Sequence, residues 1–241
     1  ELFRGRIGFV PQDDILHADL TVRQALWYSA RLRLPRDFSS AETRARVAAV
    51  VADLGLGGLE SQRIGSADRR GISGGQRKRV NVALELITDP PILVLDEPTS
   101  GLSSTDALSL VRLLRGLADD GRTVLLTIHQ PGAEILRLFD ALAVVARDES
   151  TGNSGTLAWY GPAWPDAAEF FEPGTPPDAD AILRGLERRR VADWQRDWLA
   201  SPTHAAWVGE HAAQADAPEP RTRPRGAAFL EACRQWLVLV R

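Results

Sequence analysis

The sequence feature that most constrains the fold is a short, wholly apolar run, Ile92–Leu95, which follows two prolines and ends at Asp96-Glu97. Such a run, without polar alternation, is typical of a parallel strand that is buried on both faces. Three further runs are predicted to be strands: Arg6–Val10, Thr123–Ile128 and Ala141–Ala146. The chain is therefore expected to contain a parallel sheet.

Between these runs, apolar residues recur at the spacing of helices. Ser39 and Glu42 have the spacing of a capping box, and Thr21 and Ser73 are also predicted to cap helices. Strands that alternate with helices are the signature of an α/β protein, in which helices cover the faces of a parallel sheet. The predicted helices cover residues 21–34, 39–54, 73–88, 104–118 and 132–139, with Pro131 at the first position of the last.

The composition changes after about residue 147, and six of the seven tryptophans lie at or beyond Trp159. The linker-like stretch PEPRTRPR at 218–225 is stiff and charged, and residues 229–241 return to an amphipathic helical pattern. The other predicted elements are a polar hairpin turn at 148–155, an edge strand at 157–160, and helices at 163–171, 178–190, 191–200 and 203–214.

The composition excludes several classes of protein. The 29 basic and 32 acidic residues give a net charge of −3, which argues against a general nucleic-acid binder. A single cysteine, Cys233, excludes an internal disulfide framework. No apolar run approaches the ~18 residues of a membrane span, so the chain itself is expected to be soluble.

The pair Asp96-Glu97 is the strongest candidate for chemistry, because it lies where a buried strand ends. α/β proteins bind ligands at the edge where the carboxyl ends of the strands meet. An aspartate there can hold Mg²⁺ in a nucleoside triphosphatase, and a second carboxylate can deprotonate an attacking water, a contribution of about 10²–10⁴-fold. The alternative is an acidic turn after a strand.

A second candidate is the run Ser73-Gly74-Gly75-Gln76 at a predicted helix start. Ser73 can cap the helix, and the two glycines let a phosphate approach the backbone. A helix N-terminus also supplies free N–H groups and about half a positive charge. The alternative is an ordinary helix start with a flexible glycine turn.

Two further candidates are single polar residues that follow predicted strands. His129 follows the strand at 123–128 and can donate a hydrogen bond to developing phosphate charge. Gln12 follows the strand at 6–10, and its amide oxygen can reach a metal or a water. The alternatives are a structural histidine and an ordinary loop glutamine.

The order and spacing of these four motifs, across residues 6–171, resembles the nucleotide-binding domain of an ABC transporter. The resemblance implies that Gln12 is the Q-loop glutamine, which senses Mg²⁺ and the transmembrane domain, and that Ser73–Gln76 is the signature motif, which contacts the ATP of the opposite subunit. It also implies that Asp96 is the metal-side Walker B aspartate and that Glu97 is the catalytic base. His129 is then the switch histidine at the γ-phosphate.

Three phrases are similar to the G, or White-type, subfamily: residues 72–86 (ISGGQRKRVNVALEL), 127–140 (TIHQPGAEILRLFD) and 157–162 (LAWYGP). In that group the ATPase domain precedes the membrane domain in one chain. The resemblance implies ATP and Mg²⁺ as cofactors, a head-to-tail dimer with a second ATPase domain, and a transmembrane domain that is C-terminal in the same chain. It also places the chain at the cytoplasmic face of the cell membrane.

The implied fold class is α/β, with a parallel sheet core like that of P-loop nucleoside triphosphatases, an ABC-type helical signature subdomain and a C-terminal helical extension. The domain prediction has three parts. Residues 1–172 are the C-terminal part of the ATPase domain, residues 173–225 are a helical or irregular extension and linker, and residues 226–241 begin an amphipathic connecting helix toward the membrane domain.

The sequence departs from the family pattern at two places. The phosphate-binding loop G-x-x-x-x-G-K-[ST] does not occur in these residues, so the chain is expected to be N-terminally truncated. Lys78, the single lysine, cannot replace the lysine of that loop because it lies inside the signature helix. Ser103 stands where the family usually has the D-loop aspartate that couples the two nucleotide sites.

These departures leave three alternatives open. The protein is a catalytically impaired regulatory or assembly subunit, a soluble ABC ATPase outside transport, or, as this chain alone, a binding module without activity. The principal prediction remains an ATP-binding and ATP-hydrolysing segment that couples hydrolysis to transmembrane transport. In that case Glu97 and His129 are catalytic, Ser103 and the signature residues contact nucleotide, and Asp96 with Gln12 holds the metal.

Overall fold

The computed structural model describes residues 6–66, 71–147, 155–174, 176–177 and 179–209. The chain divides into two compact units, the first ending at His129 and the second beginning at Gln130. The two units are described separately below.

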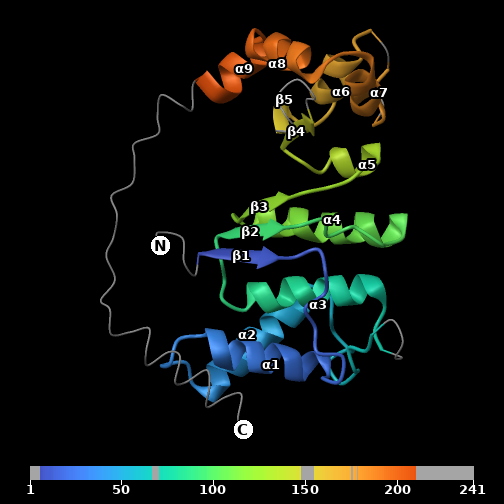
Figure 1. Ribbon diagram of the computed structural model, residues 1–241. Helices are drawn as coiled ribbons and strands as arrows, with labels where there is room; N and C mark the ends of the chain where they lie inside the picture. Colours follow the sequence, from blue (N-terminus) through green and yellow to red (C-terminus); the bar gives the residue numbers. More distant parts are fainter. Residues whose placement is uncertain (1–5, 67–70, 148–154, 175, 178, 210–241) are drawn as a thin grey trace. The chain divides into compact units, whose positions relative to one another are not determined.

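The first unit contains a parallel sheet of three strands in the order β1 (Ile7–Val10), β2 (Ile92–Leu95) and β3 (Thr123–Leu126) (Figure 1). The strands are aligned in register, so that Val10 pairs with Leu95 and Leu95 with Leu126. The predicted strand at 92–95 is confirmed, and those at 6–10 and 123–128 are confirmed with slightly shorter limits. All three carboxyl ends meet at one edge of this sheet.

Four helices accompany this sheet: α1 (Val22–Arg33), α2 (Ser40–Asp53), α3 (Gly74–Leu86) and α4 (Ser104–Asp119). The predicted caps are confirmed, because the side chains of Thr21, Ser39 and Ser73 each close a capping box with the third helical residue. Helix α3 packs beside β1 and helix α4 beside β3. Caps therefore fix where each helix begins relative to the sheet.

The core of the first unit lies against one face of the sheet. Val10, Leu93 and Leu95 are each at most 1% exposed and pack with apolar residues of all four helices. On the other face Phe9 and Leu125 are 53% and 62% exposed among the described residues. The expectation of burial on both faces is therefore not met in this part of the chain, since alternate residues of β1 and β3 face away from the core.

The second unit begins with the short helix α5 (Ala133–Leu136) and a hairpin of β4 (Ala141–Arg147) and β5 (Gly155–Pro162). The strand predicted at 141–146 forms, but it pairs antiparallel with β5 and does not join the parallel sheet. Its partner is the next strand in the described part of the chain, and an antiparallel pair needs only a short connection. The predicted turn at 148–155 lies almost wholly outside the described residues.

The helices that follow are α6 (Asp166–Phe171), α7 (Ala181–Arg188), α8 (Val191–Leu199) and α9 (Pro202–His204), with a π-helical turn at Ala205–Gly209. Helices α7 and α8 share an aromatic core with β5, which includes Trp159, Phe171 and Trp194. Residues on the C-terminal side of the predicted domain boundary at 172 thus pack on β5, which precedes that boundary.

Other differences are local. Helix α5 is shorter than the predicted 132–139, with Gly132 at the N-cap, so Pro131 lies outside it and not at its first position. The chain leaves α5 through turn-type bonds from the amides of Leu138 and Phe139. The predicted linker at 218–225 and the amphipathic helix at 229–241 lie outside the described residues. Within the described ranges, no helix has the length and apolarity to cross a membrane.

Candidate functional site

The candidate site lies at the carboxyl edge of the parallel sheet, where three loops leave the strands. The backbone ladder continues one step past the strands, because Asp96 N donates to Val10 O at 2.9 Å and Thr127 N donates to Leu95 O at 3.0 Å. These bonds hold the loop after β2 against its two neighbours. Gln12, Asp96 and Thr127 are thereby brought to one edge although they are far apart in sequence.

Glu97 is held at this edge by both its backbone and its side chain. Its amide donates to Thr127 Oγ1 at 2.8 Å, and its Oε2 accepts from Gln12 Nε2 at 3.0 Å. The backbone of Glu97 has φ of +40°, a conformation that costs a non-glycine residue energy and that surrounding contacts must enforce. The loops after β1 and β3 thus both contact Glu97, the first through its carboxylate and the second through its backbone amide.

Thr127 connects the two acidic residues. Its hydroxyl accepts from Glu97 N and donates to Asp96 Oδ1 at 2.7 Å. The sequence analysis assigned Thr127 no role. The signal that finds it is register: since Leu95 pairs with Leu126, the next residues, Asp96 and Thr127, are neighbours across the sheet edge.

The oxygen atoms at this edge suit a hard cation. Mg²⁺ prefers carboxylate and amide oxygens, and usually binds through one or two carboxylates together with substrate phosphates. Asp96 supplies a carboxylate, and the amide of Gln12 turns its nitrogen to Glu97, so that its oxygen stays available. Among the described residues no group of three His, Cys, Asp or Glu side chains gathers for a metal. The donor set therefore fits a metal completed by water and phosphate.

The signature residues form the first turn of α3. Ser73 Oγ accepts from Gln76 N at 3.2 Å, and Gln76 Oε1 accepts from Ser73 N at 2.8 Å. The side chain of Gln76 is thus engaged within its own helix. Gly75 faces α4, where an added Cβ would lie 3.2 Å from Asp106 Cγ, whereas a Cβ at Gly74 would lie 3.8 Å from Leu102 Cδ2, an ordinary contact distance. The backbone at Gly74 is therefore the less crowded of the two.

Two predicted residues stand apart from the Glu97 cluster. Ser103 caps α4, since its Oγ accepts from Asp106 N at 3.1 Å and donates to Asp106 Oδ2 at 2.9 Å. His129 lies two residues beyond Thr127 and is exposed; the hydrogen bonds of the described chain do not include its side chain. The structure thus brings together Gln12, Asp96 and Glu97, while Ser103 and His129 lie outside their hydrogen-bond network.

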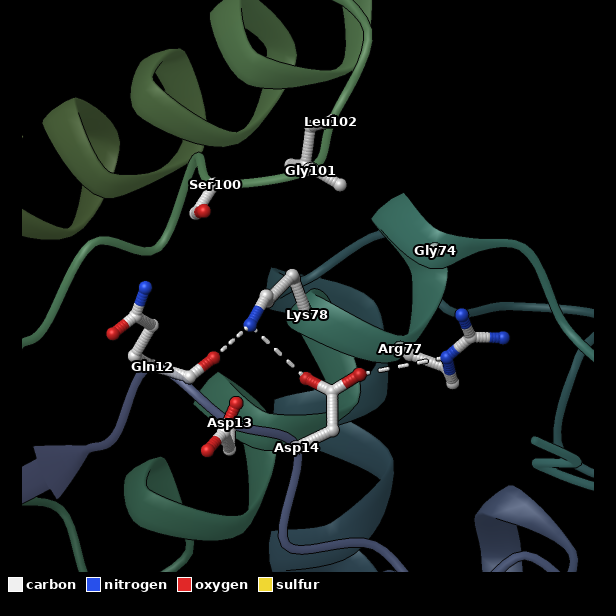
Figure 2. Close-up of a pocket in the computed structure, with 9 residues that line it drawn as sticks. All are labelled: Gln12, Asp13, Asp14, Gly74, Arg77, Lys78, Ser100, Gly101 and Leu102. Atoms are coloured by element: carbon white, nitrogen blue, oxygen red, sulfur yellow. Dashed lines mark hydrogen bonds and ion pairs between the residues drawn. The ribbon is translucent and has the colours of Figure 1, made fainter. Parts of the chain in front are cut away.

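A pocket of about 300 Å³ adjoins the site, between the loop after β1, the start of α3 and the loop before α4 (Figure 2). Gln12 and Lys78 line it on one side, and Gly74 and Gly101 also border it. Lys78 Nζ donates to the backbone oxygen of Gln12. The signature helix and the Gln12 loop are therefore in direct contact.

Comparison with known proteins shows which proteins this chain is similar to. Residues 1–100 match the family model for ABC transporters. The chain is 46% identical over 156 residues to ABC transporter G family member 28 of Arabidopsis thaliana, covering 65% of this chain and 14% of the relative. It is 45% identical over 161 residues to the broad substrate specificity ATP-binding cassette transporter ABCG2 of Bos taurus, covering 67% and 24%. The alignments thus span less than a quarter of the length of these relatives.

A solved structure agrees on the fold. CbiO1 from Clostridium perfringens, part of the ABC transporter complex CbiONQ, has a TM-score of 0.54 at 22% identity, over 81% of this chain and 68% of that chain. At this identity the likeness shows the fold alone, and it confirms the predicted α/β class with a parallel sheet core. The family model and the G-family relatives show that the chain is similar, over part of its length, to G-family ABC transporters.

Proposed function

We propose that the full-length protein is an ATP-driven membrane transporter and that this chain forms part of its ATPase domain. The observation that carries the proposal is the convergence of Gln12, Asp96, Glu97 and Thr127 at one sheet edge. The Gln12–Glu97 bond of 3.0 Å and the Thr127–Asp96 bond of 2.7 Å join loops from all three strands. Such a cluster of acid, amide and hydroxyl groups suits phosphoryl transfer to water.

Glu97 is the proposed general base. Its carboxylate accepts a proton from a water whose oxygen attacks the γ-phosphorus of ATP, and the bond from that phosphorus to the bridging oxygen breaks to leave ADP and phosphate. Gln12 restrains one carboxylate oxygen of Glu97. The hydrogen bond from the Glu97 amide to Thr127 Oγ1 fixes the Glu97 backbone. Asp96 and the Gln12 amide oxygen would hold Mg²⁺, which would supply charge neutralisation on the phosphates.

A second ATPase domain completes each nucleotide site in this proposal, in a head-to-tail dimer. The start of α3 supports this, because its first-turn N–H groups and the less crowded backbone at Gly74 suit an approaching phosphate. Ser73–Gln76 of one domain then contact the nucleotide held by the other, and His129 contacts the γ-phosphate. The transmembrane domain is placed C-terminal in the same chain, with the ATPase domain at the cytoplasmic face.

The test is ATP hydrolysis by the full-length protein with Glu97→Gln. Turnover is expected to fall about 100-fold or more, because loss of a general base removes about 10²–10⁴-fold, while ATP binding is retained. Glu134→Gln, an exposed carboxylate on α5, is the matched control and is expected to keep wild-type turnover. Unchanged turnover in Glu97→Gln sinks the assigned role.

A second candidate function is a catalytically impaired regulatory subunit, which Ser103 favours. Serine has no carboxylate to offer a second site. Its hydroxyl instead caps α4. If this candidate is right, Ser103→Asp raises turnover in the full-length protein, because aspartate supplies the missing carboxylate and can still accept the hydrogen bond from Asp106 N at the helix cap. Equal turnover in the two proteins excludes it. A long apolar segment downstream of Arg241 in the full-length sequence would exclude the soluble, non-transport alternative.

A further inference from the structure

One buried charged residue lies against the loop that carries Gln12. Lys78, the only lysine of the sequence, lies on α3 just past the signature turn, and its side chain is 9% exposed. Its Nζ donates to the backbone oxygen of Gln12 and pairs with Asp14 Oδ1 at 3.2 Å (Figure 2). Both acceptors belong to the loop that carries Gln12.

Asp14 is in turn held by other donors of the same helix. Asn81 Nδ2 donates to Asp14 Oδ1 at 2.6 Å, and Arg77 Nε lies 3.5 Å from Asp14 Oδ2. Residue 81 is three positions from residue 78 and four from residue 77, so it neighbours both on the surface of α3. The loop is therefore fastened to α3 at two points, the Gln12 carbonyl and the Asp14 carboxylate.

Burial makes this attachment hard to release. A buried ammonium is strongly unfavourable unless acceptors replace its lost water. The acceptors that the structure gives Lys78 are both on the Gln12 loop, so a loop that moves away leaves the charge uncompensated. The burial of Lys78 thus opposes displacement of Gln12.

We propose that Lys78 is a positioning residue that holds Gln12 in place against Glu97. Its bond fixes the main chain of Gln12, whose side chain donates to Glu97 at 3.0 Å. The helix that carries Lys78 begins with Ser73–Gln76, so this helix and the Glu97 carboxylate are joined through the side chains of Lys78 and Gln12. The inference rests on the proposed function and assigns a connection between the signature turn and the catalytic base.

The chain offers a matched control that contacts the same helix from α1. Arg33 on α1 also bonds a backbone carbonyl and a carboxylate, Leu84 O at 2.8 Å and Glu85 Oε2 at 2.7 Å. Both of its acceptors belong to α3, and neither lies in the Gln12 loop. Arg33→Met therefore removes the same kinds of contact from α3 and leaves the attachment of Gln12 in place.

The first experiment measures the loop without using activity. A nitroxide label is placed at position 13 in a Cys233→Ser background, and its mobility is compared in the Lys78→Met and Arg33→Met chains. The label is expected to become mobile in Lys78→Met and to stay at the wild-type mobility in Arg33→Met. Asp14→Asn, which keeps the side-chain size, is expected to mobilise the label as well. If Lys78→Met does not fold, this second variant provides the test.

The second experiment is a double-mutant cycle on ATP turnover by the full-length protein. Lys78→Met is expected to lower kcat about 10-fold, since a small misplacement of catalytic groups costs up to about 10²-fold, with KM for ATP within about twofold. In a Gln12→Ala background the same change is expected to have no further effect, because Lys78 acts through Gln12. Arg33→Met is expected to keep kcat within about twofold.

The two experiments separate the inference from the proposed function. A label that stays immobile in both Lys78→Met and Asp14→Asn overturns the inference, as does a Lys78→Met effect of equal size with and without Gln12. If wild-type protein does not hydrolyse ATP, the proposed function fails, and the label mobility still decides whether Lys78 positions Gln12.

Discussion

The hydroxyl of Thr127 can be removed with almost no change of shape by Thr127→Val. Valine keeps the β-branched side chain at the end of β3, but it can neither accept the bond from Glu97 N at 2.8 Å nor donate to Asp96 Oδ1 at 2.7 Å. The change therefore releases the Glu97 backbone and the Asp96 carboxylate together. It tests whether the acidic pair is held by its neighbours at the sheet edge.

The expected loss of stability follows from these two bonds. A hydrogen bond to a charged group contributes about 1.5–3 kcal/mol and one between neutral groups about 0.5–1.5 kcal/mol. Both bonds lie at an exposed edge, so water replaces part of each and the low end of these ranges applies. The free energy of unfolding is therefore expected to fall by about 1–2 kcal/mol in total.

Urea unfolding of the chain measures this loss, with Thr123→Val as the control. Thr123 lies on the same strand and is also exposed, and the structure shows no hydrogen bond from its side chain among the described residues. The control is expected to stay within about 0.5 kcal/mol of wild type, with equal m-values in all three chains. If the two valine variants are equally stable, the bridging role of Thr127 is wrong.

Two further predictions concern stability elsewhere in the chain. Hydrogen bonding from Arg122 holds the pKa of Asp89 below its ordinary value, so the contribution of Asp89 to stability is present above its unfolded-state pKa and is lost as pH falls through its folded-state pKa. In urea unfolding, the stability advantage of wild type over Asp89→Asn is expected to shrink below about pH 4. A difference that stays constant with pH contradicts this. Gly185→Ala is expected to cost about 1–3 kcal/mol, because the new Cβ would lie 2.7 Å from Phe171 Cβ. Gly116→Ala, in open space on α4, is the control and is expected to stabilise the chain by about 0.5–1 kcal/mol; a thermal melt in which both variants behave alike refutes the clash.

Much of the first unit could be predicted from local sequence. The limits of the strand at 92–95 follow from the prolines before it and the acidic pair after it. The starts of α1, α2 and α3 follow from capping boxes, in which residues three apart satisfy each other's backbone and side chain. Because parallel strands present their carboxyl ends together, the meeting of Gln12 with Glu97 could also be anticipated.

The contacts that the sequence analysis missed depend on pairing between distant segments. The predicted hairpin turn at 148–155 already links the strands at 141–146 and 157–160, but that these two strands form a sheet of their own became visible only in the fold. Lys78 and Gln12 are 66 residues apart, so no spacing rule connects them. Thr127 needed the register of β3 against β2, and the aromatic core of the second unit joins residues on both sides of the predicted boundary at 172.

The identity of the nucleotide retained by full-length protein carrying Glu97→Gln tests the central claim most directly. After incubation with ATP and Mg²⁺, the protein is separated from free nucleotide, and the bound nucleotide is released and analysed by chromatography. If Glu97 is the general base, the variant retains ATP, whereas wild-type protein treated in the same way yields ADP. Recovery of ADP from the variant at the wild-type rate contradicts the account, because hydrolysis then proceeds without the Glu97 carboxylate.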